Sequence, residues 1–209
     1  TTFLVHAAIG GSMPAASFGV NGGWGGIRST KNLVYAFGSD TLTDGRALFY
    51  TTGQNLEIND ITKFTDGYAI TKYKNVDRNG VKGSDATGNY VDTDFPMLRL
   101  ADIYLMYAEA TLQGGNGDLN TAIGYVNQLR ERAYGNQSAN VTSIDMNFIM
   151  NERAREMYWE CWRRSDLVRW GVFTGGTYVW PYKGGDPAGI SVPTYLDLYP
   201  LPSADLAAN

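Results

Sequence analysis

Apolar residues recur at steps of three and four along residues 97–113 and again along 118–133, and this spacing predicts two amphipathic helices. Pro96 precedes the first helix and two glycines follow it, while Asp118 is placed to cap the second. The short connection predicts an antiparallel helical hairpin. Small residues on both helices allow close approach, which is typical of a tetratricopeptide-type unit.

Two further helices are expected after the hairpin. One covers about residues 144–162, and a shorter one covers about residues 165–173, capped by Ser165 or Asp166. The segment after residue 174 is interrupted by prolines. Prolines favour extended backbone, so we expect a tail that lies along the helices without adding another helix.

The first 95 residues have a different texture, with many Gly, Thr, Asn and Asp residues between short apolar runs. They predict a short helix that Ser29 or Thr30 caps and that ends at Phe37, and strands at residues 46–50 and 68–73. The chain is therefore expected to be mainly α with irregular loop-rich segments. A loop-rich region with short strands and one short helix covers residues 1–95, and a helical region with an extended tail covers 96–209.

Composition narrows the function classes. The 209 residues include 17 Lys and Arg against 21 Asp and Glu, for a net charge of −4, which argues against a nucleic-acid binder. No run approaches the roughly 18 apolar residues of a membrane span. One cysteine and one histidine exclude an internal disulfide framework, a cysteine-based zinc site and a His-rich metal centre. The 25 glycines and the 13% aromatic residues are typical of a secreted or surface binding protein.

The densest group of charges admits a catalytic interpretation and a structural one. It consists of acidic and basic residues on the last two predicted helices: Glu152, Arg153, Arg155, Glu156, Glu160, Arg163, Arg164, Asp166 and Arg169. A glycosidase would use two such carboxylates as acid and base. An arginine beside a carboxylate lowers its pKa, which is the wrong direction for a general acid. We therefore interpret the group as a structural ion-pair network and predict no catalytic residue.

Trp24 is the first candidate for ligand binding. Glycines surround it at residues 22–26, so its indole is either inserted into the core or displayed, and an exposed Trp is typical of a binding surface. Aromatic rings stack on sugar rings, and the neighbouring Asn21 and Arg28 suit hydroxyl groups. A flexible turn is the alternative. Trp180, Tyr182 and Lys183 form a second candidate group, for which packing of the tail is the alternative.

Three other features bear on metal binding and catalysis. Loop oxygens suitable for calcium occur at Asp77, Asn79, Asp85, Asp92 and Asp94, but their spacing is not that of a calcium loop, and no other cofactor is expected. Cys161 is expected to be a small buried hydrophobe, with a reactive thiol as the alternative. His6 has no partner pattern that would indicate catalysis.

Residues 92–110, DTDFPMLRLADIYLMYAEA, resemble the characteristic helix of the SusD/RagB family, the glycan-binding lipoproteins of Bacteroidetes outer membranes. The earlier segments 23–30 and 44–46 are similar to the family as well. The match continues in order at Ala122, Val126, Asn127, Arg130, Arg132, Ala133, residues 152–156, 160–163, Asp166, Leu167, residues 169–171, 198–202, Asp205 and Asn209. Cys161 is a departure, because the family usually has glycine there.

The resemblance implies non-catalytic binding of poly- or oligosaccharide at the bacterial cell surface, beside a SusC-like TonB-dependent transporter. It also implies that the helical motif residues are mainly structural. The chain begins at Thr1 without a signal peptide or lipidated cysteine, so we expect part of a longer protein whose outer-membrane anchor lies upstream. The alternative function is a tetratricopeptide-like protein-interaction module with no sugar site of its own.

Overall fold

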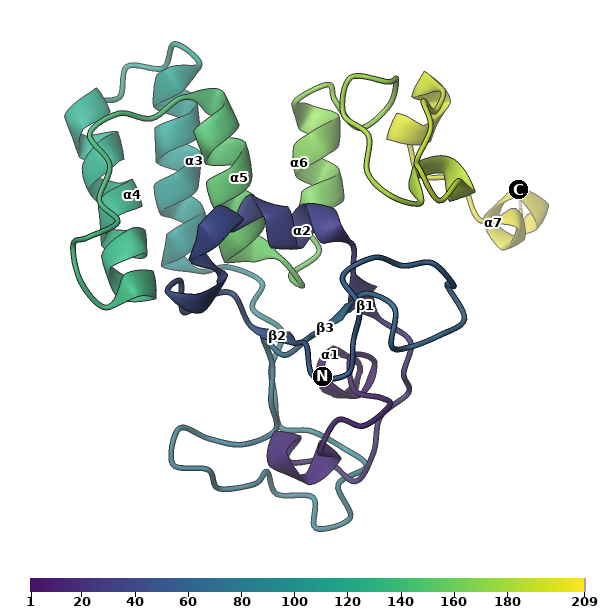
Figure 1. Ribbon diagram of the computed structural model, residues 1–209. Helices are drawn as coiled ribbons and strands as arrows, with labels where there is room; N and C mark the ends of the chain where they lie inside the picture. Colours follow the sequence, from purple (N-terminus) through teal and green to yellow (C-terminus); the bar gives the residue numbers. More distant parts are fainter. Residues whose placement is uncertain (209) are drawn as a thin grey trace. The chain divides into compact units, whose positions relative to one another are not determined.

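A computed structural model describes residues 1–208, which form two compact units, and Asn209 lies outside the described residues (Figure 1). The first unit is Thr1–Glu160, and the second begins at Cys161. The composition-based division at residue 95 stays a prediction.

The first unit contains five helices and a small sheet among the described residues. The helices are α1 (Thr2–His6), α2 (Lys31–Ala36), α3 (Leu100–Leu112), α4 (Leu119–Tyr134) and α5 (Met146–Met157), and the strands are β1 (Arg28–Ser29), β2 (Phe49–Tyr50) and β3 (Tyr68–Ile70). Short 3₁₀ turns lie at Ala15–Phe18 and Gly38–Leu42. The mainly helical fold with short strands and long loops agrees with the prediction.

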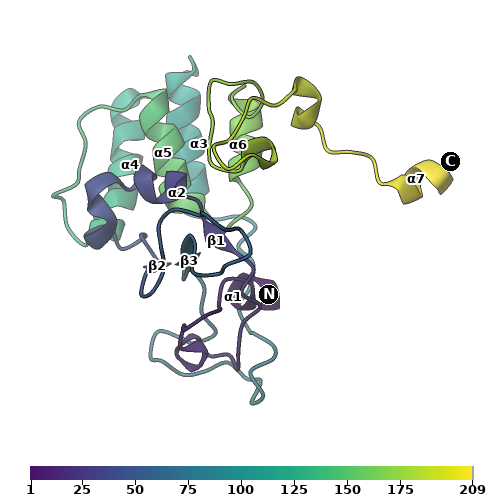
Figure 2. The ribbon, with the colours of Figure 1, turned by 45° about the vertical axis from the view of Figure 1, so that its right-hand side comes forward.

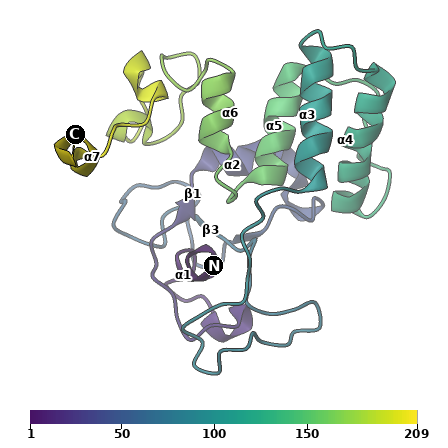
Figure 3. The same ribbon diagram turned by 180° about the vertical axis from the view of Figure 1, so that it is seen from behind.

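Helices α3 and α4 form the predicted hairpin, and α5 packs beside α3 (Figures 1 and 3). The core between them is fully buried at Leu105, Val126 and Ile149. Asp118 caps α4 as expected, because its carboxylate accepts the Thr121 amide at 2.7 Å. The hairpin prediction is therefore confirmed, including its cap.

The sheet joins segments that are far apart in the sequence. Its strand order is β1-β3-β2 with antiparallel pairs, in which Arg28 lies opposite Ala69 and Phe49 lies opposite Ile70. Both predicted strands are present but shorter than expected. Helix α2 runs from this sheet across one end of α5 (Figures 1 and 2), and it begins after Thr30 as predicted.

Helix α5 ends earlier than its sequence pattern predicts. Tyr158 turns to extended backbone with ψ 150°, and Trp159 has a φ of +63°. Left-handed backbone is unfavourable for residues other than glycine, so tertiary contacts must hold this turn. The helix predicted to continue to residue 162 therefore stops at Met157.

The second unit holds α6 (Arg163–Arg169), 3₁₀ turns at Lys183–Gly185 and Thr194–Asp197, and α7 (Ser203–Ala208). The residue that precedes α6 is Trp162, so the prediction of a cap at Ser165 or Asp166 is wrong. The predicted absence of helix in the tail is wrong as well. Pro202 stands just before α7, where a missing amide costs the helix nothing.

Across residues 1–208 every helix is too short or too polar to cross a membrane.

Candidate functional site

The loop that carries Trp24 is tied to α1 and the turn after it by backbone hydrogen bonds. The Trp24 amide donates to the His6 carbonyl oxygen at 2.8 Å, and the Gly25 amide donates to the Ile9 carbonyl oxygen at 2.8 Å. The amides of residues 26 and 27 both donate to the Ala7 carbonyl oxygen, at 3.2 and 2.9 Å. A Cβ on Gly23 would lie 2.1 Å from the Ile9 carbonyl oxygen, so only glycine permits this close approach. The loop has a defined position, which favours display of Trp24 over a flexible turn.

Trp24 is displayed as part of a row of rings. Its side chain is 59% exposed, and one face packs on the buried His6 imidazole, with ring centroids 5.6 Å apart and planes 24° apart. Phe3 of α1 is 53% exposed, and its centroid lies 6.1 Å from that of Trp24. Buried His6 therefore supports an exposed aromatic surface, a role for which the sequence carried no signal.

The two polar residues predicted beside Trp24 have different surroundings. Asn21 is exposed, and its side-chain amide donates to Asn89 Oδ1 at 2.7 Å. Arg28 donates from Nε to the Asp66 carbonyl oxygen at 2.8 Å and from Nη2 to the Ile61 carbonyl oxygen at 2.9 Å. Arg28 therefore braces a neighbouring loop, and its contact with sugar hydroxyls stays a prediction.

The second candidate group lies in the second unit and is largely engaged in packing. Trp180 is half-buried against Phe173 and Tyr178, with ring centroids 5.7 and 5.8 Å away. Lys183 is buried, and its Nζ donates to the carbonyl oxygens of Gly175 at 2.9 Å and Tyr178 at 2.6 Å. Tyr182 has a φ of +68° in the turn between them. These contacts describe tail packing, and sugar binding here stays a prediction.

The acidic loop uses its carboxylates to hold its own backbone. Asp77 Oδ1 accepts the amides of Asn79 and Val81 at 2.8 Å each. Asp85 accepts the Tyr90 amide at 2.8 Å, and this and similar bonds lower the pKa of Asp85 to about 2. The structure, as far as residue 208, contains no group of three or more His, Cys, Asp or Glu side chains placed to hold a metal. Calcium binding, for which Asp92 and Asp94 were also candidates, stays a prediction.

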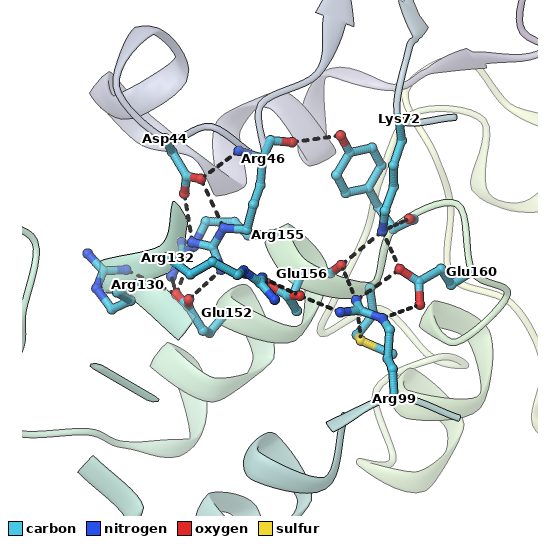
Figure 4. A network of polar contacts seen from close by, with 12 residues as sticks. Asp44, Arg46, Lys72, Arg99, Arg130, Arg132, Glu152, Arg155, Glu156 and Glu160 are labelled. Carbon is cyan, nitrogen blue, oxygen red and sulfur yellow. Dashed lines mark hydrogen bonds and ion pairs between the residues drawn. The ribbon is translucent and has the colours of Figure 1, made fainter. Parts of the chain in front are cut away.

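The acidic residues on α5 and just after it form a buried charged ladder, defined here as Glu152, Glu156 and Glu160 with their cationic partners (Figure 4). The first rung is Glu152, whose side chain is fully buried. It accepts from Arg46 at 2.7 Å, from Arg130 at 3.0 Å and from Arg155 at 2.5 Å. Arg46 also forms a two-point contact with Asp44, at 2.9 and 2.7 Å.

Glu156 and Glu160 complete the ladder. Glu156 accepts from Arg46 at 3.2 Å, from Arg99 at 2.5 Å and from Arg132 at 2.6 Å. Glu160 accepts from Arg99 at 2.8 Å and from Lys72. Four chain segments therefore meet α5 through charge-assisted hydrogen bonds, which are stronger than neutral ones.

The electrostatics of Glu152 and Glu156 argue against general-acid chemistry at these two carboxylates. Burial alone would raise the pKa of Glu156, but Arg132 and Arg99 outweigh burial and lower it to about 2. For Glu152, burial is likewise outweighed, chiefly by the charges of Arg46 and Arg155, and its pKa is lowered. A general acid needs a raised pKa, so the glycosidase interpretation fails at these residues.

The remaining charged residues of the predicted network have other partners. Arg153 is buried on α5 and pairs with Asp102 of α3 at 2.8 Å. In the second unit, Arg163 donates to the Tyr178 hydroxyl at 2.8 Å, and Asp166 pairs with Arg169 at 2.9 Å. The sequence did not point to Arg46, Arg99 or Lys72 as ladder partners, because they lie 57 to 110 positions away.

Cys161 corrects the sequence-based expectation of a buried thiol. It is exposed, and its backbone φ is +63°. This conformation favours glycine, which is the usual residue at this position in the family that the sequence resembles. The departure noted in the sequence therefore places a side chain on strained backbone.

The sequence of this chain matches one protein family. The sequence model of the SusD family matches residues 40–209. Starch-binding protein SusD of Bacteroides thetaiotaomicron is 42% identical over 188 residues, which are 88% of this chain and 32% of that protein. SusD-like protein P25 of Formosa agariphila is 36% identical over 118 residues, 54% of this chain and 22% of the relative. A SusD-like protein of Bacteroides ovatus is 32% identical over 169 residues, 75% and 30% of the two chains.

The chain thus spans about a third of the length of the first of these relatives and no more of the others. The family match covers the hairpin, the charged ladder and the second unit, and the 42% identity extends it over most of the chain. The chain belongs to the SusD family.

Proposed function

We propose that this protein binds oligo- or polysaccharide at the bacterial cell surface and is not an enzyme. Membership of a family with a starch-binding relative supports a carbohydrate ligand. The observation that carries the proposal is Trp24, an indole displayed on a firmly held loop. An exposed aromatic ring with a rigid support offers contact area at little cost in conformational entropy.

The proposal includes delivery of the bound glycan to a SusC-like TonB-dependent transporter in the outer membrane. Surface attachment would come from a lipid anchor outside these residues. The buried and paired carboxylates of Glu152 and Glu156 support binding without hydrolysis, because the pKa of each is lowered and a general acid needs a raised pKa.

The proposal is tested by titrating the protein with a panel of oligosaccharides and measuring binding by calorimetry. Trp24→Ala should abolish or strongly weaken binding, because it removes the stacking face. Tyr35→Ala is the matched control, since Tyr35 is also 59% exposed but lies on α2. Equal glycan affinity of Trp24→Ala and wild type would show that the site assignment is wrong. No response of the wild type to any glycan would overturn the proposed function.

A second candidate function, a protein-interaction module, is favoured by an exposed apolar stripe on α3. Leu100, Ile103 and Met106 are 61%, 51% and 41% exposed and follow one another along the helix. Exposed apolar stripes are typical of protein contacts. This candidate predicts that a purified SusC-like transporter captures the protein, that Ile103→Glu prevents this capture, and that the wild type responds to no glycan.

A further inference from the structure

Phe3 is an exposed aromatic residue that core packing does not account for. Helix α1 buries Leu4, Val5 and His6, while the Phe3 ring stays 53% exposed at the edge of the Trp24 surface. The two ring centroids are 6.1 Å apart, and the ring planes are inclined by 55°. This separation is too small for a sugar ring to be held between them, so each ring offers its own face.

Each of the two exposed rings rests on a second ring. Trp24 packs on His6, and Phe3 stacks on Trp159 with centroids 5.8 Å apart and planes 26° apart. Trp159 in turn donates from Nε1 to the Leu4 carbonyl oxygen at 2.9 Å. The Phe3 ring is therefore fixed before a ligand arrives, which lowers the entropic cost of binding.

The backbone of Trp159 is held in an unfavourable conformation at this point. Its φ of +63° is rare for a residue other than glycine and carries a cost that the surrounding contacts must offset. Lys72 Nζ donates to the carbonyl oxygens of Glu156 and Tyr158 at 2.9 and 2.8 Å and also binds the Glu160 carboxylate. These contacts fix the segment on both sides of Trp159 and keep its ring against Phe3.

We infer that Phe3 is a second sugar-contact residue, so that this surface takes a chain of at least two linked sugar residues, one on Trp24 and one on Phe3. Trp159 is a positioning residue that orients Phe3. The inference rests on the proposed function and adds to it a second contact residue, Phe3, supported by Trp159.

The test compares the dependence of affinity on sugar length in wild type and variants. Glucose, maltose and maltotriose form one probe series, and glucose, cellobiose and cellotriose form the other, each titrated by calorimetry. In the series that binds, wild type should gain about tenfold on addition of the second sugar, which is about 1.4 kcal/mol. Phe3→Leu should lose that gain, so that it binds the disaccharide no more tightly than glucose, whereas Phe3→Tyr should retain it.

Thermal unfolding of Phe3→Leu and Phe3→Tyr checks that both variants fold. Trp159→Phe should keep part of the gain, because a ring still supports Phe3. If Trp24→Ala loses binding while Phe3→Leu keeps the full length dependence, the inference about Phe3 is overturned and the proposed function stands. If wild type binds neither series nor any other oligosaccharide, both fall together.

Discussion

Glu156 provides the sharpest test of the charged ladder, because its carboxylate holds three arginines from separate segments. It accepts from Arg46 at 3.2 Å, Arg99 at 2.5 Å and Arg132 at 2.6 Å. Glu156→Gln preserves the shape and removes the charge. Breaking a buried ion pair at one partner costs about 3 to 5 kcal/mol. Because Arg132 is 54% exposed and water screens its share, we expect a loss near the lower end, about 3 kcal/mol at pH 6.

The pH dependence gives this prediction a definite sign. The pKa of Glu156 is about 2 in the folded protein, against an ordinary value of 4.5. Since the unfolded chain binds this proton more tightly, acid favours unfolding. This pKa difference corresponds to about 3 kcal/mol of folding stability. That stability is present in full above the pKa of the unfolded chain and is lost as the pH falls through 4.5 toward 2. The stability gap between wild type and Glu156→Gln should therefore narrow by about 2 kcal/mol between pH 6 and pH 3.

Urea unfolding followed by tryptophan fluorescence at pH 6 and pH 3 measures both quantities. The matched control is Glu57→Gln, because Glu57 is 52% exposed and pairs with Lys31 at 2.9 Å on the surface. That variant should lose less than about 1 kcal/mol at pH 6. A similarly small loss in Glu156→Gln, or a gap that stays constant with pH, would refute the assignment of net stabilisation to the ladder.

Three further predictions concern single positions. Gly23→Ala should lower stability by about 2 kcal/mol or more in thermal unfolding, since its Cβ would meet the Ile9 carbonyl oxygen at 2.1 Å, whereas Gly22→Ala should be tolerated because nothing lies within 4 Å. Cys161→Gly should raise stability by about 1 kcal/mol through relief of the positive φ, and the wild-type thiol should react with a thiol reagent in the folded protein. Asp118→Ala should cost about 1 kcal/mol, measured by urea unfolding, through loss of the α4 cap.

Local patterns in the sequence predicted the elements whose cause is local. The hairpin follows from apolar spacing, and the cap at Asp118 follows from the preference of helix starts for aspartate. The display of Trp24 follows from its glycine neighbours. Glycine is needed there because the loop lies close to the backbone of residues 6–9. In each case the feature depends on residues in a short stretch of chain or on the conformational properties of a single residue type.

Features that depend on distant partners could not be predicted. The turn that ends α5 is held by distant partners, among them Lys72 and the Leu4 carbonyl oxygen, which lies 155 positions from Trp159, and nothing in residues 158–162 breaks a helix by composition. The sequence predicts that the carboxylates of the ladder are paired, but it does not identify Arg46, which is 106 positions from Glu152. Phe3 was missed because a single exposed aromatic residue near the start of the chain carries no periodic signal.

The ladder and the aromatic surface belong to one physical arrangement, although the sequence presents them as separate features. Lys72 and Arg99 bind Glu160, and Lys72 also binds the backbone carbonyls on either side of Met157. That fixed segment carries Trp159, whose ring supports Phe3. The desolvation of so many charges is costly, and replacing them with apolar residues could give equal stability. Charged contacts are also directional, so the ladder that stabilises the fold also holds the strained turn at Trp159, and with it the ring that packs against Phe3.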